Sequence, residues 1–204
     1  MRKSLLIFLL LLSFSLLGCK RDKIDWTPVP DSIKNKSTQK GAGWDNVPAG
    51  KYVDEINFTT EDNKQLRGKY FYSHNAKDSL QPVVILIHQF NSNWDEWDMG
   101  FVDSLIAMNC KIFIFNIRGH GGSDKQNGKL ESILTDPNQA PLDLKAAVKW
   151  LAQQKGADTN RLAAIGTSVG GNMALYGALN LNIKVPVAIS NGKATFEAFT
   201  GYNE

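Results

Sequence analysis

The feature that most restricts the fold of this chain is a set of four short, continuous apolar runs rich in β-branched residues. A strand with one face in water alternates apolar and polar residues, whereas a continuous run is typical of a strand buried on both faces, as in a parallel sheet. The segments between the runs carry apolar residues at helical spacing, which predicts helices. The predicted strands are residues 82–88, 111–117, 161–166 and 185–190, and the predicted helices are residues 94–108, 142–154 and 170–179.

A different pattern precedes the four runs. Two stretches, residues 52–59 and 65–72, alternate apolar and polar residues on either side of the polar turn 61–64, which predicts an antiparallel hairpin. Strands that alternate with helices form a sheet with helices on both faces. The sequence therefore predicts an α/β fold over residues 51–204, a mainly parallel, doubly wound sheet entered by an antiparallel hairpin.

The first 18 residues have the parts of a secretory signal peptide. A basic start at Arg2 and Lys3 precedes an apolar run of 13 residues, residues 5–17. Gly18 then places a small residue before a cysteine. Because the apolar run is too short to span a membrane as a helix, we predict a signal peptide over residues 1–18 and export from the cytosol.

The segment Leu16-Leu17-Gly18-Cys19 resembles the lipobox of bacterial lipoproteins. This resemblance implies cleavage before Cys19, lipidation of its thiol and anchoring of the protein to the membrane of the bacterial cell envelope. Because Lys20 rather than an Asp follows Cys19, the resemblance favours the outer membrane or cell surface over the inner membrane. An ordinary secretory signal or a retained anchor is the alternative.

Residues 19–50 are rich in polar residues, Pro and Gly and have few apolar residues. Such a segment buries too little apolar surface to offset the entropy of ordering, so we predict a flexible tether. Docking of Trp26 or Trp44 onto the domain or a partner is an alternative. Without the signal peptide, 21 basic and 20 acidic side chains leave a net charge of +1, which does not indicate a nucleic-acid partner.

One short motif indicates chemistry. Ser168 lies at the centre of Gly166-Thr167-Ser168-Val169-Gly170, where a predicted strand is followed by a predicted helix. A Gly-x-Ser-x-Gly motif in this context is typical of a hydrolase nucleophile, because the sharp turn exposes the serine Oγ at the carboxyl edge of the sheet. Gly166 and Gly170 have no side chains to obstruct this turn. We predict that Ser168 is a nucleophile.

Three segments, residues 87–90, 118–123 and 166–171, together resemble the α/β-hydrolase superfamily in their order and spacing. The likeness covers residues 52–191 and is strongest to single-domain esterases, dienelactone-hydrolase-like proteins and serine peptidases. It implies hydrolysis of a small carboxylic ester, or of a peptide, through an acyl-serine intermediate on Ser168. No cofactor is implied, because acyl transfer by this route needs none.

The resemblance also assigns roles around the nucleophile. The backbone N–H groups of Phe90 and Val169 would form the oxyanion hole, and His88 would order the loop that carries Phe90. Arg118 and His120 would brace the loop after the second apolar run. No pair of histidines has the spacing of metal ligands, so no metal site is predicted.

One part of the family's machinery is not found in the sequence. His74, His88 and His120 all precede Ser168, whereas in this family the acid and the base follow the nucleophile. The last apolar run, residues 185–190, would also lie at an open sheet edge. We therefore expect the hydrolase domain to be incomplete at its C-terminal end, where it lacks its last strands and helices.

Three interpretations stay open. In the first, a longer chain or a second polypeptide supplies the missing strands, the acid and the histidine, and the protein is an active esterase. In the second, the chain is a truncated hydrolase without activity. In the third, it is a lipid-anchored binding protein that keeps the cleft without turnover. Covalent labelling of Ser168 separates the first interpretation from the other two.

Overall fold

The computed structural model describes residues 51–202. The predicted signal peptide 1–18, the predicted tether 19–50 and the predicted lipidation site Cys19 lie outside the described residues, as do residues 203 and 204 of the predicted domain. No helix in the described part of the chain is both long and apolar enough to cross a membrane.

Six β-strands, four α-helices and three short 3₁₀ helices are present within residues 51–202. The strands are β1 (Lys51–Thr59), β2 (Gln65–Ser73), β3 (Gln81–Ile87), β4 (Lys111–Phe115), β5 (Ala157–Thr167) and β6 (Val185–Ile189). The α-helices are α3 (Met99–Ala107), α4 (Ala140–Leu151), α5 (Val169–Asn180) and α6 (Lys193–Thr200). The 3₁₀ helices are η1 (His74–Ala76), η2 (Trp94–Glu96) and η3 (Leu130–Leu134).

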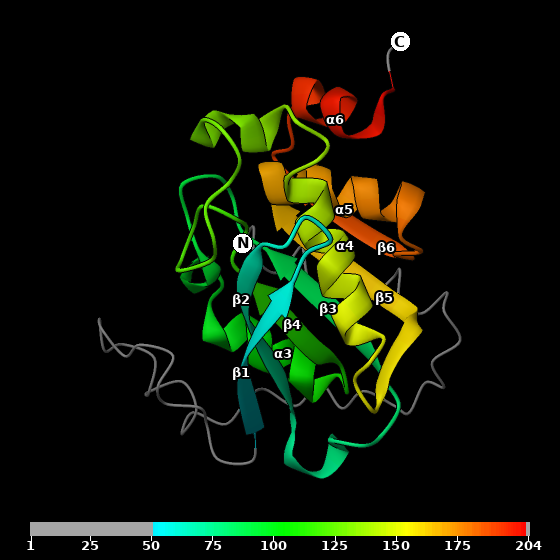
Figure 1. The fold of residues 1–204 in the computed structure, drawn as a ribbon. Coiled ribbons are helices and arrows are strands. Elements are labelled where there is room, and N and C mark those ends of the chain that lie inside the picture. Colours follow the sequence, from blue (N-terminus) through cyan, green and yellow to red (C-terminus); the bar gives the residue numbers. More distant parts are fainter. Residues whose placement is uncertain (1–50, 203–204) are drawn as a thin grey trace. The chain divides into compact units, whose positions relative to one another are not determined.

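The strands form one mixed sheet in the order β1-β2-β4-β3-β5-β6 (Figure 1). β1 and β2 are antiparallel, and β2 is antiparallel to β4. β3 is parallel to β4 and β5, and β5 is parallel to β6. The prediction of a mainly parallel sheet that is entered by an antiparallel hairpin is therefore confirmed.

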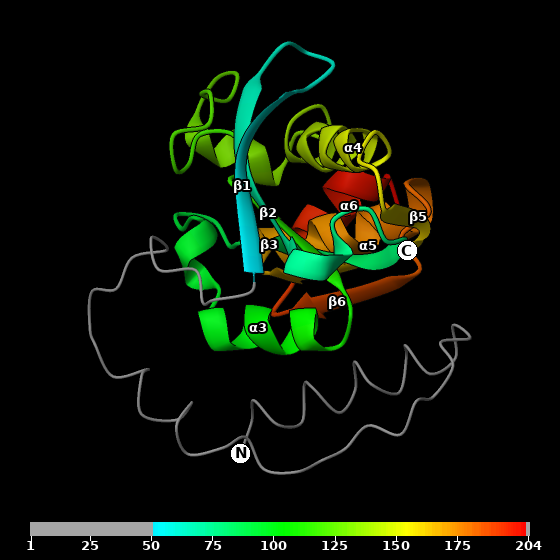
Figure 2. The ribbon, with the colours of Figure 1, turned by 90° about the horizontal axis from the view of Figure 1, so that it is seen from below.

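Helices cover both faces of the sheet. Parallel strands are joined by right-handed crossovers, so the direction of each step across the sheet decides the face on which the connecting helix lies. The step from β3 to β4 runs toward the hairpin, whereas the steps from β4 to β5 and from β5 to β6 run away from it. α3 therefore packs on one face and α4 on the other, as Figure 2 shows, and α5 contacts α4.

The central strands form the core of the domain. Residues 83–87 in β3 and 112–115 in β4 are fully buried, as expected for continuous apolar runs covered on both faces. Trp150 of α4 stacks on Phe113 with ring centroids 5.0 Å apart, and Phe58 of β1 contacts the same ring edge-on at 5.6 Å. These aromatic contacts hold α4 and the hairpin against the sheet.

Two expectations from the sequence need correction. β6 is not buried on both faces: Val185 is buried, but residues 186–189 are half-buried, because β6 pairs only with β5 among the described strands. The predicted helix 94–108 is divided into η2 and α3. Asp98 caps the start of α3 by accepting hydrogen bonds from two of its backbone N–H groups, which favours a new helix at that point. The short helix α6 has no counterpart among the predicted elements.

Candidate active site

The register of two neighbouring strands brings the sequence motifs together. β3 and β5 are parallel, and Ile87 pairs with Gly166 at their carboxyl ends. The loop after β3 and the turn after β5 therefore begin side by side at one edge of the sheet. Because β4 lies on one side of β3 and β5 on the other, this edge is the topological switch point, where open α/β sheets bind their ligands.

Ser168 occupies the sharp turn between β5 and α5. Its backbone has φ 50° and ψ −115°, a strained conformation for a residue with a side chain. A Cβ at Gly166 would overlap the carbonyl of Gly170, and a Cβ at Gly170 would overlap the carbonyl of Ile87, so both positions require glycine. A 2.8 Å hydrogen bond from the Ser168 N–H to the carbonyl of Ile189 ties the turn to β6.

The Ser168 side chain is half-exposed, and within residues 51–202 its Oγ has no hydrogen-bond partner. α5 begins at Val169, and the first N–H groups of a helix have no acceptor within the helix. The helix dipole adds positive potential at the same place. The turn therefore combines an unbonded hydroxyl with backbone donors and a favourable potential for a negative charge.

The loop after β3 leaves one backbone N–H group without a protein acceptor. The Gln89 N–H donates to a carboxylate oxygen of Glu96 at 3.0 Å, and the Asn91 N–H donates to Nε2 of His120 at 3.0 Å. The Ser92 N–H donates to the carbonyl of Gln89 at 3.3 Å. Of these neighbouring amides, only the Phe90 N–H has no acceptor in the described part of the chain.

Two histidine side chains at this edge are engaged in hydrogen bonds with the backbone. His88 accepts the Ile117 N–H at Nε2 (3.0 Å), and its Nδ1 lies 2.7 Å from the carbonyl of Gln89. His120 uses Nε2 for the loop amide described above, and its Nδ1 lies 3.0 Å from the carbonyl of Arg118. In both rings Nε2 accepts a backbone N–H and Nδ1 faces a carbonyl oxygen, so the proton is assigned to Nδ1. Neither imidazole is free to take a proton from a serine.

Burial, with a smaller contribution from the nearby His120, lowers the pKa of His88 to about 4, against the opposing effect of the hydrogen bond to the Gln89 carbonyl. In the unfolded chain the pKa returns to about 6.5, so between these values the unfolded state binds a proton that the folded state does not. The stability contributed by the neutral ring is therefore complete above about pH 6.5 and is lost as the pH falls toward 4.

We expect His88 alone to make the free energy of unfolding about 2 kcal/mol lower at pH 5 than at pH 7.5. Urea unfolding of the full chain over this range measures the change. In a His88→Asn variant, which has no imidazole at this position, the decline toward acid pH should be shallower by that amount. An equally steep decline in both proteins would show that other groups cause it.

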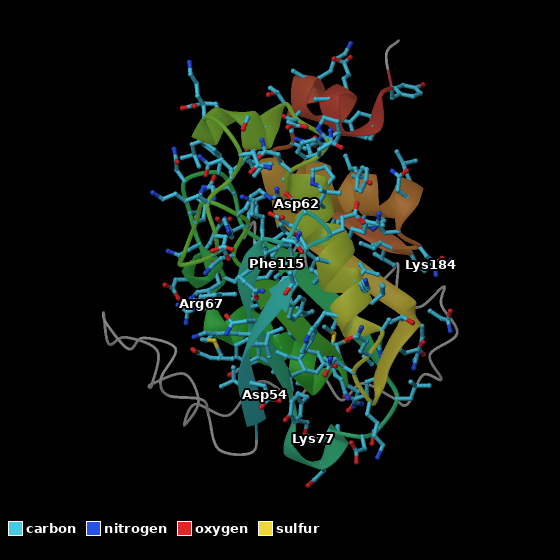
Figure 3. All side chains as sticks on the ribbon, in the orientation of Figure 1. Asp54, Asp62, Arg67, Lys77, Phe115 and Lys184 are labelled. Carbon is cyan, nitrogen blue, oxygen red and sulfur yellow. The ribbon has the colours of Figure 1, made fainter. Side chains whose placement is uncertain are left out.

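A buried ion cluster supports the loop after β4. Arg118 is fully buried, and its guanidinium lies 2.7 Å from Asp143 of α4 and 2.7 Å from Asp62. Asp62, labelled in Figure 3, is in the turn between β1 and β2. Burial raises the pKa of Asp143 to about 7 against the opposing effect of the Arg118 charge. Partial burial of Asp62 disfavours its ionisation, but hydrogen bonds from Arg118 and Thr60 outweigh this effect and lower its pKa.

Sequence patterns did not indicate three of the polar residues at this edge, Glu96, Asn116 and Asp143. Asn116 is buried, where it accepts the Trp94 N–H at 2.8 Å and donates to the Gly121 carbonyl at 2.7 Å. Asp143 is an acidic residue on the buried side of α4, and this break in the apolar pattern is a signal that could have found it. Glu96 and Asn116 carry no such signal, because their partners come from distant segments.

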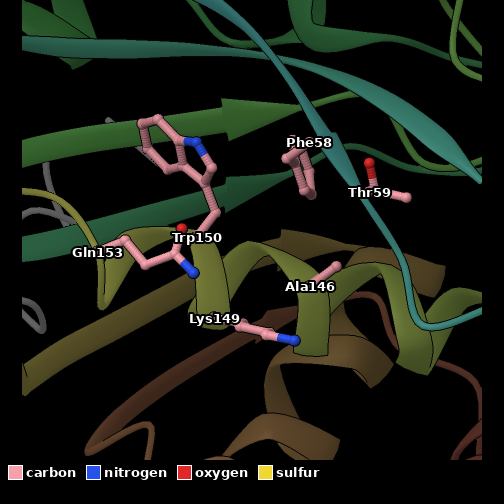
Figure 4. Close-up of a pocket in the computed structure, with 6 residues that line it drawn as sticks. All are labelled: Phe58, Thr59, Ala146, Lys149, Trp150 and Gln153. Atoms are coloured by element: carbon pink, nitrogen blue, oxygen red, sulfur yellow. The ribbon is translucent and has the colours of Figure 1, made fainter.

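A separate pocket of about 240 Å³ lies between β1 and α4 (Figure 4). None of the residues around Ser168 lines it. Its lining residues are Phe58, Thr59, Ala146, Lys149, Trp150 and Gln153. Within residues 51–202, no group of three or more His, Cys, Asp or Glu side chains is arranged to hold a metal ion.

Comparison with protein families gives a match over most of the described domain. The family model of the alpha/beta hydrolase fold matches residues 82–199, which is more than half of the chain. "Uncharacterized protein YfhR" of Salmonella typhimurium (strain LT2) is 26% identical over 133 residues, which cover 63% of this chain and 41% of that protein. The chain thus spans less than half the length of this relative.

Solved structures share the architecture. The Pyrococcus furiosus esterase Pf2001 is 28% identical with a TM-score of 0.53, covering 65% of this chain and 46% of that chain. For hypothetical protein PA2218 from Pseudomonas aeruginosa the identity is 20%, the TM-score 0.62 and the coverage 81% and 51%. For the alpha/beta hydrolase GrgF from Penicillium sp. sh18 the values are 23%, 0.55, 67% and 44%. With its family-model match, sheet order and Gly-x-Ser-x-Gly turn, the chain belongs to the α/β-hydrolase fold family.

Proposed function

We propose that this protein is a serine hydrolase that cleaves carboxylic esters through an acyl-enzyme intermediate on Ser168. The observation that carries the proposal is the unbonded, half-exposed Ser168 hydroxyl on a strained turn at the switch point of the sheet. Such a turn holds the Oγ atom in reach of a bound carbonyl carbon. Attack by Oγ gives a tetrahedral intermediate, which expels the alcohol and leaves the acyl group on the serine.

The same part of the structure has two backbone N–H groups for the negative charge of that intermediate. The Phe90 N–H, from the loop after β3, and the Val169 N–H, at the start of α5, have no acceptors within residues 51–202. We assign these two groups as the oxyanion hole. Donors that are fixed before the reaction stabilise a developing oxyanion without a further cost of reorganisation.

The reaction also needs a base for the Ser168 hydroxyl proton. The hydrogen bonds of His88 and His120 exclude both from this role. The remaining histidine, His74, begins η1 near Lys77, which Figure 3 shows at the far end of the molecule from Asp62. We propose that the base and its orienting acid come from a further segment of the protein or from a second polypeptide, which would pair with the open edge of β6.

An ester is preferred to a peptide as the substrate class. Among the similar structures, the esterase Pf2001 of Pyrococcus furiosus has the sequence identity of 28% already noted, which is high enough to carry information beyond the fold. We therefore propose a small carboxylic ester as the substrate, bound at the carboxyl edge of β3 and β5.

Covalent labelling tests the proposal directly. The complete enzyme, that is the chain together with the segment or second polypeptide that supplies the base, is incubated with a fluorophosphonate probe, digested with trypsin and analysed by mass spectrometry. The expected adduct lies on the peptide 162–184, whose only serine is Ser168. The heat-denatured enzyme, in which no site is assembled, should give no adduct. Absence of the adduct from the native complete enzyme would overturn the proposal in favour of an inactive hydrolase or a non-catalytic binding protein.

A further inference from the structure

Glu96 connects the two segments that carry the proposed oxyanion donors. One carboxylate oxygen accepts the Gln89 N–H at 3.0 Å, and the other accepts the hydroxyl of Thr167. Gln89 immediately precedes Phe90 in the loop, and Thr167 immediately precedes Ser168 in the turn. A single side chain thus bridges the loop and the turn at the positions next to the proposed donor and the nucleophile.

The bridge lies where the backbone no longer holds the two segments together. The ladder between β3 and β5 ends at the pair Ile87 and Gly166. Beyond that pair, within residues 51–202, the side chain of Glu96 is the only one that forms hydrogen bonds with both the loop and the turn. The distance between loop and turn past the end of the sheet therefore depends on this carboxylate.

Glu96 is itself held in place by the end of β4. It is the last residue of η2, which is capped by the Asn93 side chain through a 2.7 Å bond from the Asp95 N–H. The Trp94 N–H donates to the buried Asn116 at 2.8 Å, which anchors η2 to the residue after β4. Because these hydrogen bonds fix η2, they also fix the position of the Glu96 carboxylate.

We propose that Glu96 is a positioning residue that sets the place of the Phe90 N–H relative to Ser168. The inference rests on the proposed function of Ser168 and adds a residue that neither the Gly-x-Ser-x-Gly motif nor the oxyanion donors include. By accepting the Gln89 N–H, the carboxylate also removes a competing donor and leaves the Phe90 N–H as the neighbouring amide without an acceptor within residues 51–202. Displacement of an oxyanion donor by about 1 Å costs on the order of 100-fold in rate.

A carboxylate suits this role better than an amide. Both bonds are donated to Glu96, so both of its oxygens act as acceptors. A glutamine keeps both bonds only in one orientation, in which its oxygen accepts the Gln89 N–H and its NH₂ group donates to the Thr167 hydroxyl. Thr167 offers the matching test from the other side, because valine has the same shape without the hydroxyl and serine keeps the hydroxyl.

The experiment compares Glu96→Ala, Glu96→Gln, Thr167→Val and Thr167→Ser in the complete enzyme, which includes the segment or polypeptide that supplies the base. Two measurements are made: hydrogen exchange of the peptide that covers residues 88–93, and kcat and KM for p-nitrophenyl acetate. In Glu96→Ala and Thr167→Val we expect faster exchange in this loop and a fall in kcat of roughly 10- to 100-fold with little change in KM. Thr167→Ser should resemble the wild type, and Glu96→Gln should lie between.

Each result decides one part of the proposal. Unchanged exchange in Glu96→Ala and in Thr167→Val would show that the carboxylate does not hold the loop. Faster exchange with an unchanged kcat would reduce Glu96 to a structural residue and overturn the positioning role. If the complete wild-type enzyme neither hydrolyses the ester nor reacts with a fluorophosphonate, the proposed function fails, and loop exchange alone decides whether Glu96 holds the loop. Should Glu96→Ala not fold, Thr167→Val tests the same bridge from its other end.

Discussion

Replacement of Ser168 by alanine is expected to lower the kcat for ester hydrolysis by at least about 10⁴-fold. Alanine has no atom that can form the acyl ester, so the variant loses the covalent route and keeps only the contributions of the oxyanion donors and of substrate binding. Because the Oγ atom has no hydrogen-bond partner within residues 51–202, its removal should leave the stability of the fold nearly unchanged. The measurement is kcat for p-nitrophenyl acetate with the purified complete enzyme, which includes the segment or polypeptide that supplies the base.

A matched serine provides the control. Ser79 is exposed and lies in the connection between β2 and β3, just before β3 begins. It is therefore at the amino end of β3, on the opposite edge of the sheet from Ser168. Ser79→Ala should therefore keep wild-type turnover and should still form the fluorophosphonate adduct at Ser168. Turnover by Ser168→Ala close to that of Ser79→Ala would mean that the ester is cleaved by another group, and the acyl-serine mechanism would then be wrong.

Replacement of Arg118 by leucine is expected to lower the free energy of unfolding by about 3–5 kcal/mol. The substitution leaves the fully buried Asp143 without its cationic partner, and it also removes the partner of Asp62. An unpaired carboxylate in the core costs far more than the removal of an exposed ion pair. Urea unfolding of the variant and the wild type at pH 7.5 measures the difference.

The loss in Arg118→Leu should also depend on pH. Without the guanidinium, burial raises the pKa of Asp143 further, opposed now by the backbone N–H of residue 118, so the folded variant binds a proton that the unfolded chain releases. The stability that the variant loses relative to the wild type should therefore grow as the pH rises from 5 to 8. Lys155→Ala, which removes an ion pair with Asp78 in which both side chains are mostly exposed, should change stability far less. An equal loss in the two variants would contradict the assigned role of the buried cluster.

Much of the fold could be predicted because its elements are encoded locally. The continuous apolar runs correspond to strands whose residues 83–87 and 112–115 are fully buried, and the alternating pattern before them corresponds to the hairpin of β1 and β2. The helix predicted over residues 94–108 was wrong in one respect, since Asp98 starts a new helix within it. A capping carboxylate competes locally with the helical pattern, and the apolar spacing alone does not show which of the two prevails.

The candidate site also has a part that the sequence predicts and a part that it does not. Ser168, Gly166 and Gly170 could be located from five consecutive residues, because the requirement for a sharp turn without obstructing side chains is itself local. The hydrogen bonds of His88 and His120 could not be predicted from the sequence. Whether they were free bases or structural groups depended on Ile117 for His88 and on Asn91 for His120, and each partner is 29 residues away in the sequence.

The sequence by itself determined the strand and helix pattern, the Gly-x-Ser-x-Gly turn and its family resemblance. Only the tertiary structure decided which amides of the loop after β3 are occupied, that Glu96 joins this loop to the turn, and that Arg118 pairs with two carboxylates at once. The physical reason is the range of the interactions. Backbone conformation and burial periodicity are imposed by neighbours in the chain, whereas a hydrogen bond or ion pair forms only when the packing of distant segments places donor and acceptor within about 3 Å.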